Sequence, residues 1–247
     1  MKTFIQVITL FFISFGIHSS YAQTFEKDLS SFKKIILSPE INLELVKGDQ
    51  EYIKVEYQGV EEDKINVVVR GKTLKIFLDN ARITPKQLKI RNKNYWNMKE
   101  SIYKNAQVTA YVTYQTLRNL QVRGNENVII NDVIEEDKFT LKTMGETQIA
   151  INDIDLKKFK VVAYGENQLI VKQGNAEKQV FKLFGENLIA SKNLNGEKVK
   201  TNLYGENKIV LNAKDKLKVN AFGESKILNK GEGVSRKGLV LGENKIH

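Results

Sequence analysis

The stretch Gly165-Glu166-Asn167 returns along the C-terminal half of this 247-residue chain. Identical copies begin at Gly185, Gly205 and Gly242, and near copies are Gly124-Asn125-Glu126, Gly145-Glu146-Thr147 and Gly223-Glu224-Ser225. Successive glycines lie 21, 20, 20, 20, 18 and 19 residues apart. A fixed period of about 20 residues is typical of proteins that stack one structural unit on the next.

Apolar residues recur at fixed places around each glycine. Four positions after it stand Val128, Ile149, Leu169, Ile189, Ile209, Ile227 and Ile246. Two positions before it stand Val122, Thr143, Ala163, Leu183, Leu203, Ala221 and Val240. Alternate residues of a strand line one face, so these positions are expected to face a core. Each unit is predicted to be a strand, a bend at the glycine and a second strand.

The sequence therefore predicts an all-β fold. We expect a β-solenoid, a right-handed parallel β-helix-like stack of ~20-residue coils, behind an N-terminal β unit. One unit cannot bury its own apolar face, whereas stacked units bury it and pair their backbone groups. An antiparallel meander of hairpins, with the Gly-Glu-Asn stretch at each tip, is the alternative.

The glycine and asparagine of the stretch have structural explanations. Glycine adopts positive φ at a corner, and stacked asparagines can form an amide ladder. The residues assigned to this structural role are Gly145, Gly165, Asn167, Gly185, Asn187, Gly205, Asn207, Gly223, Gly242 and Asn244.

The glutamates that follow the glycines would form a column of like charges at strand spacing, which is unfavourable unless they are solvated or hold cations. A solvated column is favoured, because the Asp-rich nonapeptide of calcium-binding solenoids is absent. The residues before the glycines form an aromatic and aliphatic column of Met144, Tyr164, Phe184, Tyr204, Phe222 and Leu241. Packing at the corner is favoured for this column over a sugar- or protein-contacting stripe.

The first 22 residues are predicted to be a signal peptide. Lys2 precedes a mostly apolar stretch over 4–17, and Ser20-Tyr21-Ala22 fits a cleavage site. An uncleaved anchor is the alternative. The segment predicts export to the periplasm, the outer cell surface or the extracellular space.

The remaining residues, 23–247, are expected to form one domain. A polar lead-in over 23–31 precedes predicted strands at 32–37, 41–46, 52–57, 65–69, 73–78 and 107–113. Residues 70–72 are predicted to form a hairpin turn between the strands at 65–69 and 73–78. The N-terminal strands are expected to occupy 23–122, and the Gly-Glu-Asn repeats 123–247.

A basic, aromatic stretch over 80–105 interrupts the strand pattern, with Glu100 as its only acid. Long loops of this kind are often functional. Within it, the predicted ligand contacts are Arg91, Lys93, Tyr95, Trp96 and Lys99. The net charge of +10 suits polyanionic partners, although lysines on exposed strand positions also keep β proteins soluble. We favour solubility as the explanation of the overall charge.

The sequence lacks the residues that several classes of enzyme use for catalysis. The chain has no cysteine, and His247 is the only histidine beyond the predicted signal peptide. A histidine-based catalytic triad, a cysteine nucleophile and an ordinary zinc site are therefore not expected. The sequence predicts a protein that is not an enzyme and needs no cofactor or metal. A β-helical carbohydrate-active enzyme with paired carboxylates is the least favoured reading.

Residues 41–50, 73–76 and 112–124, followed by Gly-x-Asn repeats, resemble the bacterial auto-transporter adhesin head GIN domain family. The resemblance covers about residues 32–247. It implies a secreted or envelope-associated β-helical protein with no established activity.

The function expected is therefore that of a non-enzymatic, exported adhesin-like or envelope scaffold protein. A glycan- or polyanion-binding module that uses the 80–105 loop is the alternative. Partners expected are a surface glycan, lipopolysaccharide or another envelope protein, but no nucleic acid. A homo-oligomer formed through the solenoid edge is also predicted.

Overall fold

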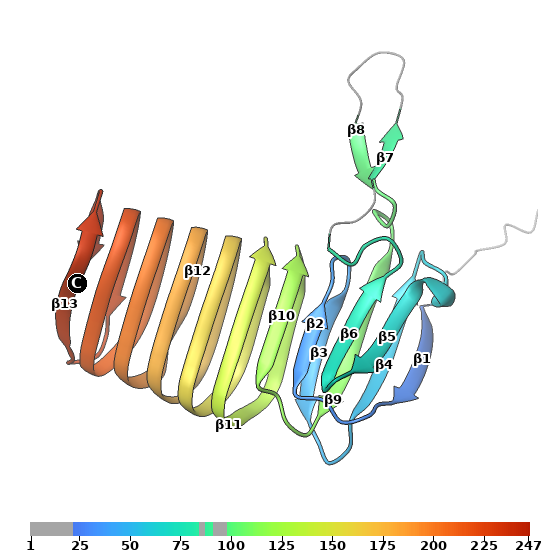
Figure 1. The fold of residues 1–247 in the computed structure, drawn as a ribbon, viewed down its shortest axis with the longest axis horizontal. Coiled ribbons are helices and arrows are strands. Elements are labelled where there is room, and N and C mark those ends of the chain that lie inside the picture. The colour runs from blue at the N-terminus through green and yellow to red at the C-terminus, as the bar shows by residue number, and fades with distance from the viewer. Residues whose placement is uncertain (1–21, 84–86, 91–97) are drawn as a thin grey trace, which may run out of the picture.

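A computed structural model describes residues 22–83, 87–90 and 98–247 of the chain (Figure 1). The predicted signal peptide and most of the predicted ligand contacts lie outside these residues. The strands are β1 (Gln23–Asp28), β2 (Lys34–Leu37), β3 (Asn42–Lys47), β4 (Tyr52–Gln58), β5 (Ile65–Arg70), β6 (Thr73–Leu78), β7 (Gln87–Ile90), β8 (Met98–Ser101), β9 (Gln107–Tyr114), β10 (Asn119–Gly124), β11 (Asn127–Gly145), β12 (Gln148–Asn229), β13 (Val234–Leu241) and β14 (Asn244–Ile246). A short 3-10 helix, η1, spans Glu62–Lys64. Within the described ranges, no helix has the length and apolar character of a membrane span.

Twelve of the strands form one sheet. Its order is β1-β4-β9-β3-β11-β10-β2-β6-β5, with β12 paired to β11 and both β13 and β14 paired to β12. The sheet curls because the two ends of β11 pair with different neighbours: Val128–Ile130 with β3, and Thr140–Gly145 with β10.

We call the side that holds β5, β6, β2, β10 and the residues before each glycine the pre-glycine face. The opposite side, with the residues after each glycine, is the post-glycine face.

The predicted β-solenoid, a regular right-handed parallel β-helix, is wrong. The pairs β1–β4, β4–β9 and β5–β6 are antiparallel, whereas β2–β6, β3–β9 and β10–β11 are parallel. The result is one curled mixed sheet that forms a half-barrel (Figure 1). The turn between β5 and β6 shows the physical reason, because Gly71 and Lys72 have φ of 55° and 61° and reverse the chain as a tight hairpin.

The strands around the Gly-Glu-Asn stretches are parallel, so the alternative of an antiparallel meander is also wrong for them. Gly145 pairs with Gly165, and Met144 pairs with Tyr164. The 82-residue β12 bends at each glycine and winds back beside itself (Figure 1). We call each ~20-residue winding a pass.

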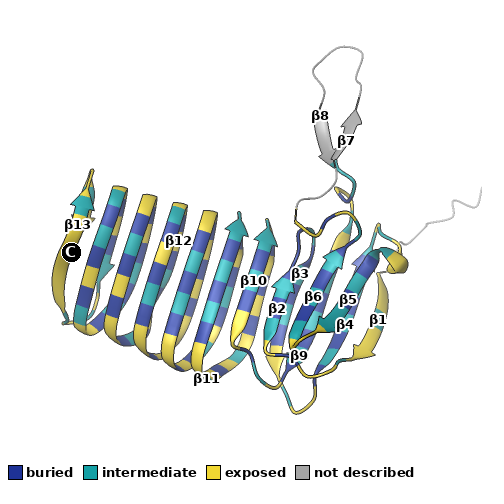
Figure 2. Cartoon of the chain, in the orientation of Figure 1, coloured by how far each residue is buried: buried dark blue, intermediate teal, exposed yellow. Residues whose placement is uncertain are grey.

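The core lies between the two faces. Buried residues alternate with more exposed ones along the strands of β11 and β12 (Figure 2), as the period of a strand requires, whereas β13 contains no buried residue. Phe139, Phe159 and Phe181 are fully buried and follow one another on successive passes, with ring centroids 6.0 and 6.2 Å apart. The predicted apolar column four positions after each glycine is also buried from Val128 to Ile227, whereas Ile246 in the last pass is half-buried.

Two segments outside the predicted strands also form strands. Residues 23–28, expected within a polar lead-in, form β1, which pairs antiparallel with β4 at one edge of the sheet. Residues 87–90 and 98–101, in the basic stretch, form the separate two-stranded sheet β7–β8. Neither segment shows a clear apolar alternation.

The last strand of the pre-glycine face, β13, contains a β-bulge. Val219 pairs with Lys237 and Ala221 pairs with Val240, so that Gly238 and Leu239 together oppose Asn220. The amide of Leu239 donates to Oδ1 of Asn220 over 3.2 Å. The strand of the other face, β14, is only three residues long.

Candidate functional site

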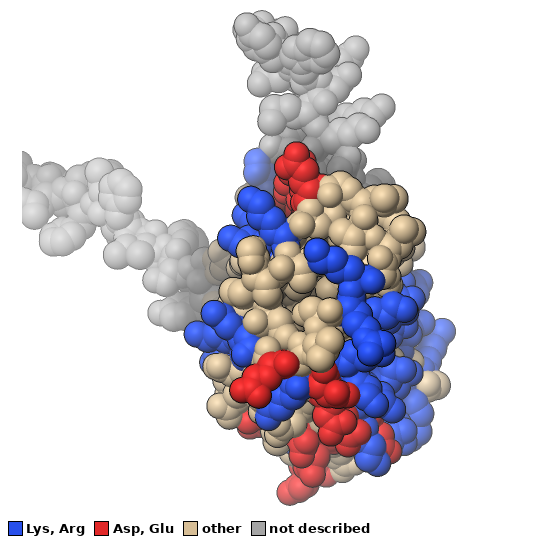
Figure 3. Space-filling view, turned by 90° about the vertical axis from the view of Figure 1, so that its left-hand side faces the viewer, with Lys and Arg blue, Asp and Glu red and all other residues tan. Residues whose placement is uncertain are grey.

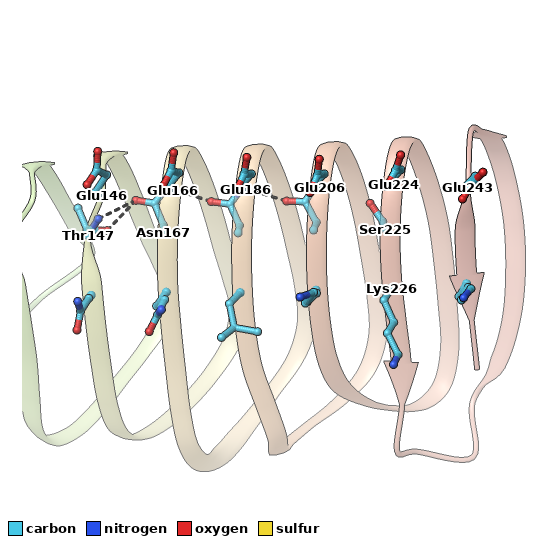
Figure 4. A pocket seen from close by; sticks show the side chains of 17 residues that line it. Glu146, Thr147, Glu166, Asn167, Glu186, Glu206, Glu224, Ser225, Lys226 and Glu243 are labelled. Carbon is cyan, nitrogen blue, oxygen red and sulfur yellow. Dashed lines mark hydrogen bonds between the residues drawn. The ribbon is translucent and has the colours of Figure 1, made fainter.

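A groove of about 620 Å³ runs along the glycine corners, across successive passes (Figure 4). Its walls come from the three positions that follow each glycine, so every pass contributes the same set of side-chain positions. The first position supplies Glu146, Glu166, Glu186, Glu206, Glu224 and Glu243; the second supplies Thr147, Asn167, Asn187, Asn207 and Ser225; the third supplies Gln148, Gln168, Leu188, Lys208, Lys226 and Lys245.

The glycines allow successive passes to approach one another closely. All six from Gly145 to Gly242 have φ between 92° and 131°, a range that side chains rarely adopt. A Cβ atom at Gly165 would collide with the carbonyl oxygen of Gly145, and one at Gly185 with that of Gly165. The corner therefore needs glycine both for its dihedral angles and for its contact with the pass before it.

Buried side chains beneath the groove form a hydrogen-bonded ladder. Thr147 Oγ1 donates to Asn167 Oδ1 over 2.8 Å, Asn167 Nδ2 donates to Asn187 Oδ1 over 3.0 Å, and Asn187 Nδ2 donates to Asn207 Oδ1 over 3.0 Å. All four are at most 4% exposed. Every bond points from one pass to the next, so the amides tie the passes together in register.

The glutamates stand on the rim of the groove and are exposed. Figure 4 shows their carboxylates side by side in a row, at the same end of successive passes. Within the described residues, no group of three or more His, Cys, Asp or Glu side chains could hold a metal ion. The rim thus presents a row of solvent-facing hydrogen-bond acceptors.

Glu126 occupies the ladder position of the first corner, where later corners have threonine, asparagine or serine. It is 7% exposed, and its Oε1 accepts from the backbone amides of Glu40 over 2.7 Å and Asn125 over 3.0 Å. Burial raises the pKa of this carboxyl from 4.5 to about 7. Its contacts join the β2–β3 turn, where Glu40 has a φ of 69°, to the first corner.

A ladder of aromatic rings flanks the groove on the pre-glycine face. The centroid distances are 4.8 Å for Tyr164–Phe184, 4.8 Å for Phe184–Tyr204 and 4.9 Å for Tyr204–Phe222, with interplanar angles of 3–6°. Each ring covers the face of its neighbour, so that mainly ring edges and hydroxyls remain open to solvent. A sugar platform needs a free ring face, so this geometry supports packing as the role of the column.

Most of the predicted ligand contacts cannot be placed. Arg91, Lys93, Tyr95 and Trp96 lie outside the described residues, and Lys99 is in β8, opposite Lys89. The patch stays a prediction. The ten structural residues are all found at the corners described above.

Sequence reasoning missed two features of the site. Glu126 could have been found from its ladder position in Gly124-Asn125-Glu126. The groove could have been found by following the third position after each glycine, which is polar in most passes.

The family model described as "Putative auto-transporter adhesin, head GIN domain" matches residues 31–233. The fold is similar to that of a putative adhesin from Bacteroides fragilis, at a TM-score of 0.75 and 20% identity, covering 92% of this chain and 97% of the other. It is also similar to a putative adhesin from Parabacteroides merdae (TM-score 0.66, 13% identity, coverage 92% and 96%) and to a putative lipid binding protein from Parabacteroides distasonis (0.62, 19%, 93% and 98%). No curated protein matches the sequence.

Proposed function

The chain belongs to the auto-transporter adhesin head GIN domain family, and we propose that it is a non-enzymatic, exported adhesin-like protein that binds glycan chains along its corner groove. The observation that carries the proposal is the form of the groove, which is long, open and built from the same positions of every pass. Such a surface suits an extended polymer whose units repeat. An enclosed cavity would suit a single small substrate better.

The groove has the hydrogen-bonding groups that sugar hydroxyls need. Carboxylates, carboxamides, hydroxyls and ammonium groups line it, with Leu188 as the exception among its third-position residues. Carboxylates accept hydrogen bonds and ammonium groups donate them, so a hydroxyl can be bound in either sense. This polar lining favours a glycan over an acyl chain, although one relative of similar fold is described as lipid binding.

A binding role agrees better with the repeated carboxylates than a catalytic one. Glycoside hydrolysis uses two carboxyl groups in different environments, one of them with a raised pKa. The groove glutamates are equivalent by position, and each is exposed. The buried carboxyl of Glu126 is held by backbone amides instead.

A glycan array probed with the exported chain, residues 23–247, tests the proposal. We expect binding to particular glycans, and loss of that binding when Glu166, Glu186 and Glu206 are replaced together by alanine. These residues are exposed, so the replacement leaves the core intact. The matched control replaces Glu177, Glu197 and Asp215 by alanine, which changes the charge equally in the turns opposite the glycine corners.

The control variant should bind as the unmodified chain does. If the chain bound no glycan, or if both variants lost binding equally, the groove would not be the adhesive surface. The first result would leave a scaffold role in the envelope as the better explanation.

A further inference from the structure

Five segments of the pre-glycine face share a composition that the groove does not explain. Each begins with lysine, contains two lysines and contains no acid. They are KFTLKTM at 138–144, KFKVVAY at 158–164, KQVFKLF at 178–184, KVKTNLY at 198–204 and KLKVNAF at 216–222.

The first lysines of these segments lie in one column that crosses five passes. Lys138 pairs with Lys158 in the parallel register. The contacts Asn167–Asn187 and Asn187–Asn207 hold the next passes at an offset of 20 residues, and Asn202–Asn220 holds the fifth at 18. These offsets align Lys178, Lys198 and Lys216 with Lys158. We call Lys138, Lys158, Lys178, Lys198 and Lys216 the lysine column.

These side chains point away from the core. The residue after each column lysine is buried, and the lysines themselves are exposed or, for Lys216, half-buried. The second lysine of each segment is Lys142, Lys160, Lys182, Lys200 or Lys218. It stands two or four positions further along, so the face carries a second, staggered row of charge.

The ten lysines lack acidic partners. In the described part of the chain none of them forms an ion pair, whereas the neighbouring Lys157 binds Asp137 at 2.6 Å. Acids lie instead at the two borders of the face, in the glutamate rim and in the turns, where the residue directly before four of the column lysines is acidic: Asp137, Glu177, Glu197 and Asp215. Viewed from the C-terminal end, Lys and Arg side chains are densest along one side of the molecule, with smaller groups elsewhere, and acidic side chains gather at the top and the bottom of the view (Figure 3).

Solubility alone does not account for this separation, because a surface built for solubility intersperses both signs of charge. Like charges at the strand spacing of about 4.8 Å repel one another. The face is therefore stabilised by any anion that bridges several passes. A polyanion does so with the least loss of entropy, because its binding releases the small counter-ions.

We propose that the lysine column binds a linear acidic polysaccharide that lies across the passes, along the long axis of the sheet. A chain of regularly spaced carboxylates can meet one ammonium group per pass. A bilayer fits less well, because the outward positions next to the column, such as Thr140, Val180 and Asn202, are small or polar. The large aromatic side chains of these segments lie at the glycine end, where they stack on one another. This site is separate from the corner groove and does not depend on its function.

Binding of residues 23–247 to immobilised polygalacturonate tests the proposal, with neutral dextran as the reference polymer. The column variant replaces the five column lysines by glutamine. The control variant replaces Lys27, Lys172, Lys192, Lys214 and Lys230 by glutamine, which removes the same charge from exposed positions outside the face. Unfolding midpoints of both variants are measured first, and the column variant should be at least as stable because repulsion is relieved.

We expect the unmodified chain to bind polygalacturonate, not dextran, with an affinity that falls steeply as salt is added. The column variant should bind about tenfold more weakly or worse, given the usual contribution of exposed ionic contacts, and the control should change little. Equal weakening in both variants would show attraction by net charge and overturn the proposal. Binding to vesicles of equal phosphatidylglycerol and phosphatidylcholine in preference to polygalacturonate would also overturn it.

Discussion

Asn187 donates from Nδ2 to Oδ1 of Asn207 over 3.0 Å, but in the described part of the chain Nδ2 of Asn207 has no acceptor. The next ladder position is Ser225, which is too short and turns to the carbonyl of Gly205. Beyond it, Oδ1 of Asn244 also lacks a partner. Two unpaired polar atoms thus flank one short side chain.

Ser225→Asn should extend the ladder. The new amide can accept from Asn207 and donate to Asn244, which satisfies both atoms. Because an unpaired buried polar group costs about 1–3 kcal/mol, the free energy of unfolding should rise by about that amount. Urea unfolding measures it. A decrease would show that the site has no room for the amide.

Asn187→Ala should break the ladder in its middle. It leaves Oδ1 of Asn207 without its donor and takes one acceptor from Asn167, so the free energy of unfolding should fall by about 2–4 kcal/mol. Asn175→Ala is the control. Asn175 accepts a hydrogen bond from Asn195 in an exposed contact between two turns at the end of the passes away from the glycine corners. A similar loss in both variants would show that a hydrogen bond of the buried ladder contributes no more to the free energy of unfolding than an exposed one.

Glu126 should make stability depend on pH. Its pKa rises from 4.5 to about 7 on folding, so the folded chain binds the proton more tightly than the unfolded chain. The contribution of this group is therefore greatest below pH 4.5 and is lost as the pH rises through about 7. Glu126→Gln keeps an oxygen for the amides of Glu40 and Asn125 and removes the charge.

At pH 8 the Glu126→Gln variant should be more stable than the unmodified chain, by up to roughly 3 kcal/mol. The difference should shrink towards pH 5. Urea unfolding at both pH values measures it. A difference that is constant with pH would show that Glu126 does not titrate in this range.

Phe184→Ala should weaken the aromatic ladder. Phe184 stacks on both Tyr164 and Tyr204, and aromatic pairs contribute about 0.5–1.5 kcal/mol each beyond their buried area. We expect a loss of about 1–3 kcal/mol and a reduced near-ultraviolet circular dichroism signal. Tyr164→Ala removes only one described stack and should cost about half as much. Equal losses would contradict the additive ladder.

Glu186→Gln tests the glutamate rim. If these carboxylates are solvated and repel one another, the variant should be slightly more stable in low salt and equal to the unmodified chain in high salt. Added calcium should leave the melting temperature of the unmodified chain unchanged. A calcium-dependent rise that Glu186→Gln abolishes would instead assign a cation to the rim.

Trp96→Ala tests the predicted contacts in the basic stretch. If Arg91, Lys93, Tyr95, Trp96 and Lys99 bind a glycan or polyanion, this variant should lose binding that the variant of the lysine column retains. Surface binding assays on both variants separate the two sites. Unchanged binding in Trp96→Ala would remove the stretch from the list of binding surfaces.

The sequence predicted the passes well because the same stretch, with the same apolar positions around it, recurs in each of them. Gly145, Gly165 and Gly185 keep one spacing, and only parallel neighbours in register bring identical corners together. The N-terminal strands were also placed, and the predicted hairpin turn at residues 70–72 is confirmed by the antiparallel β5–β6 pair, but the directions of the other strands were not predicted. The alternation of buried and exposed residues in β4 or β5 is the same whether a neighbour is parallel or antiparallel, so the half-barrel could not be foreseen.

Other misses have local causes. β1 has one large apolar residue, Phe25, because it is an edge strand that covers little of the core. The lysine column was overlooked because charge was counted over the whole chain. Only the alignment of passes shows that Lys138 and Lys158 are direct neighbours in one column.

The β-bulge at Gly238 and Leu239 has a consequence for assembly. In-register parallel strands, amide ladders and stacked rings are also the contacts that hold amyloid fibrils together, and there an open edge templates the next chain. Here β13, the edge strand of the pre-glycine face, is kinked by its extra residue and carries Arg236 and Lys237, features that disfavour edge pairing. This edge of the described sheet is therefore a poorer template for another strand than the open edge of a fibril.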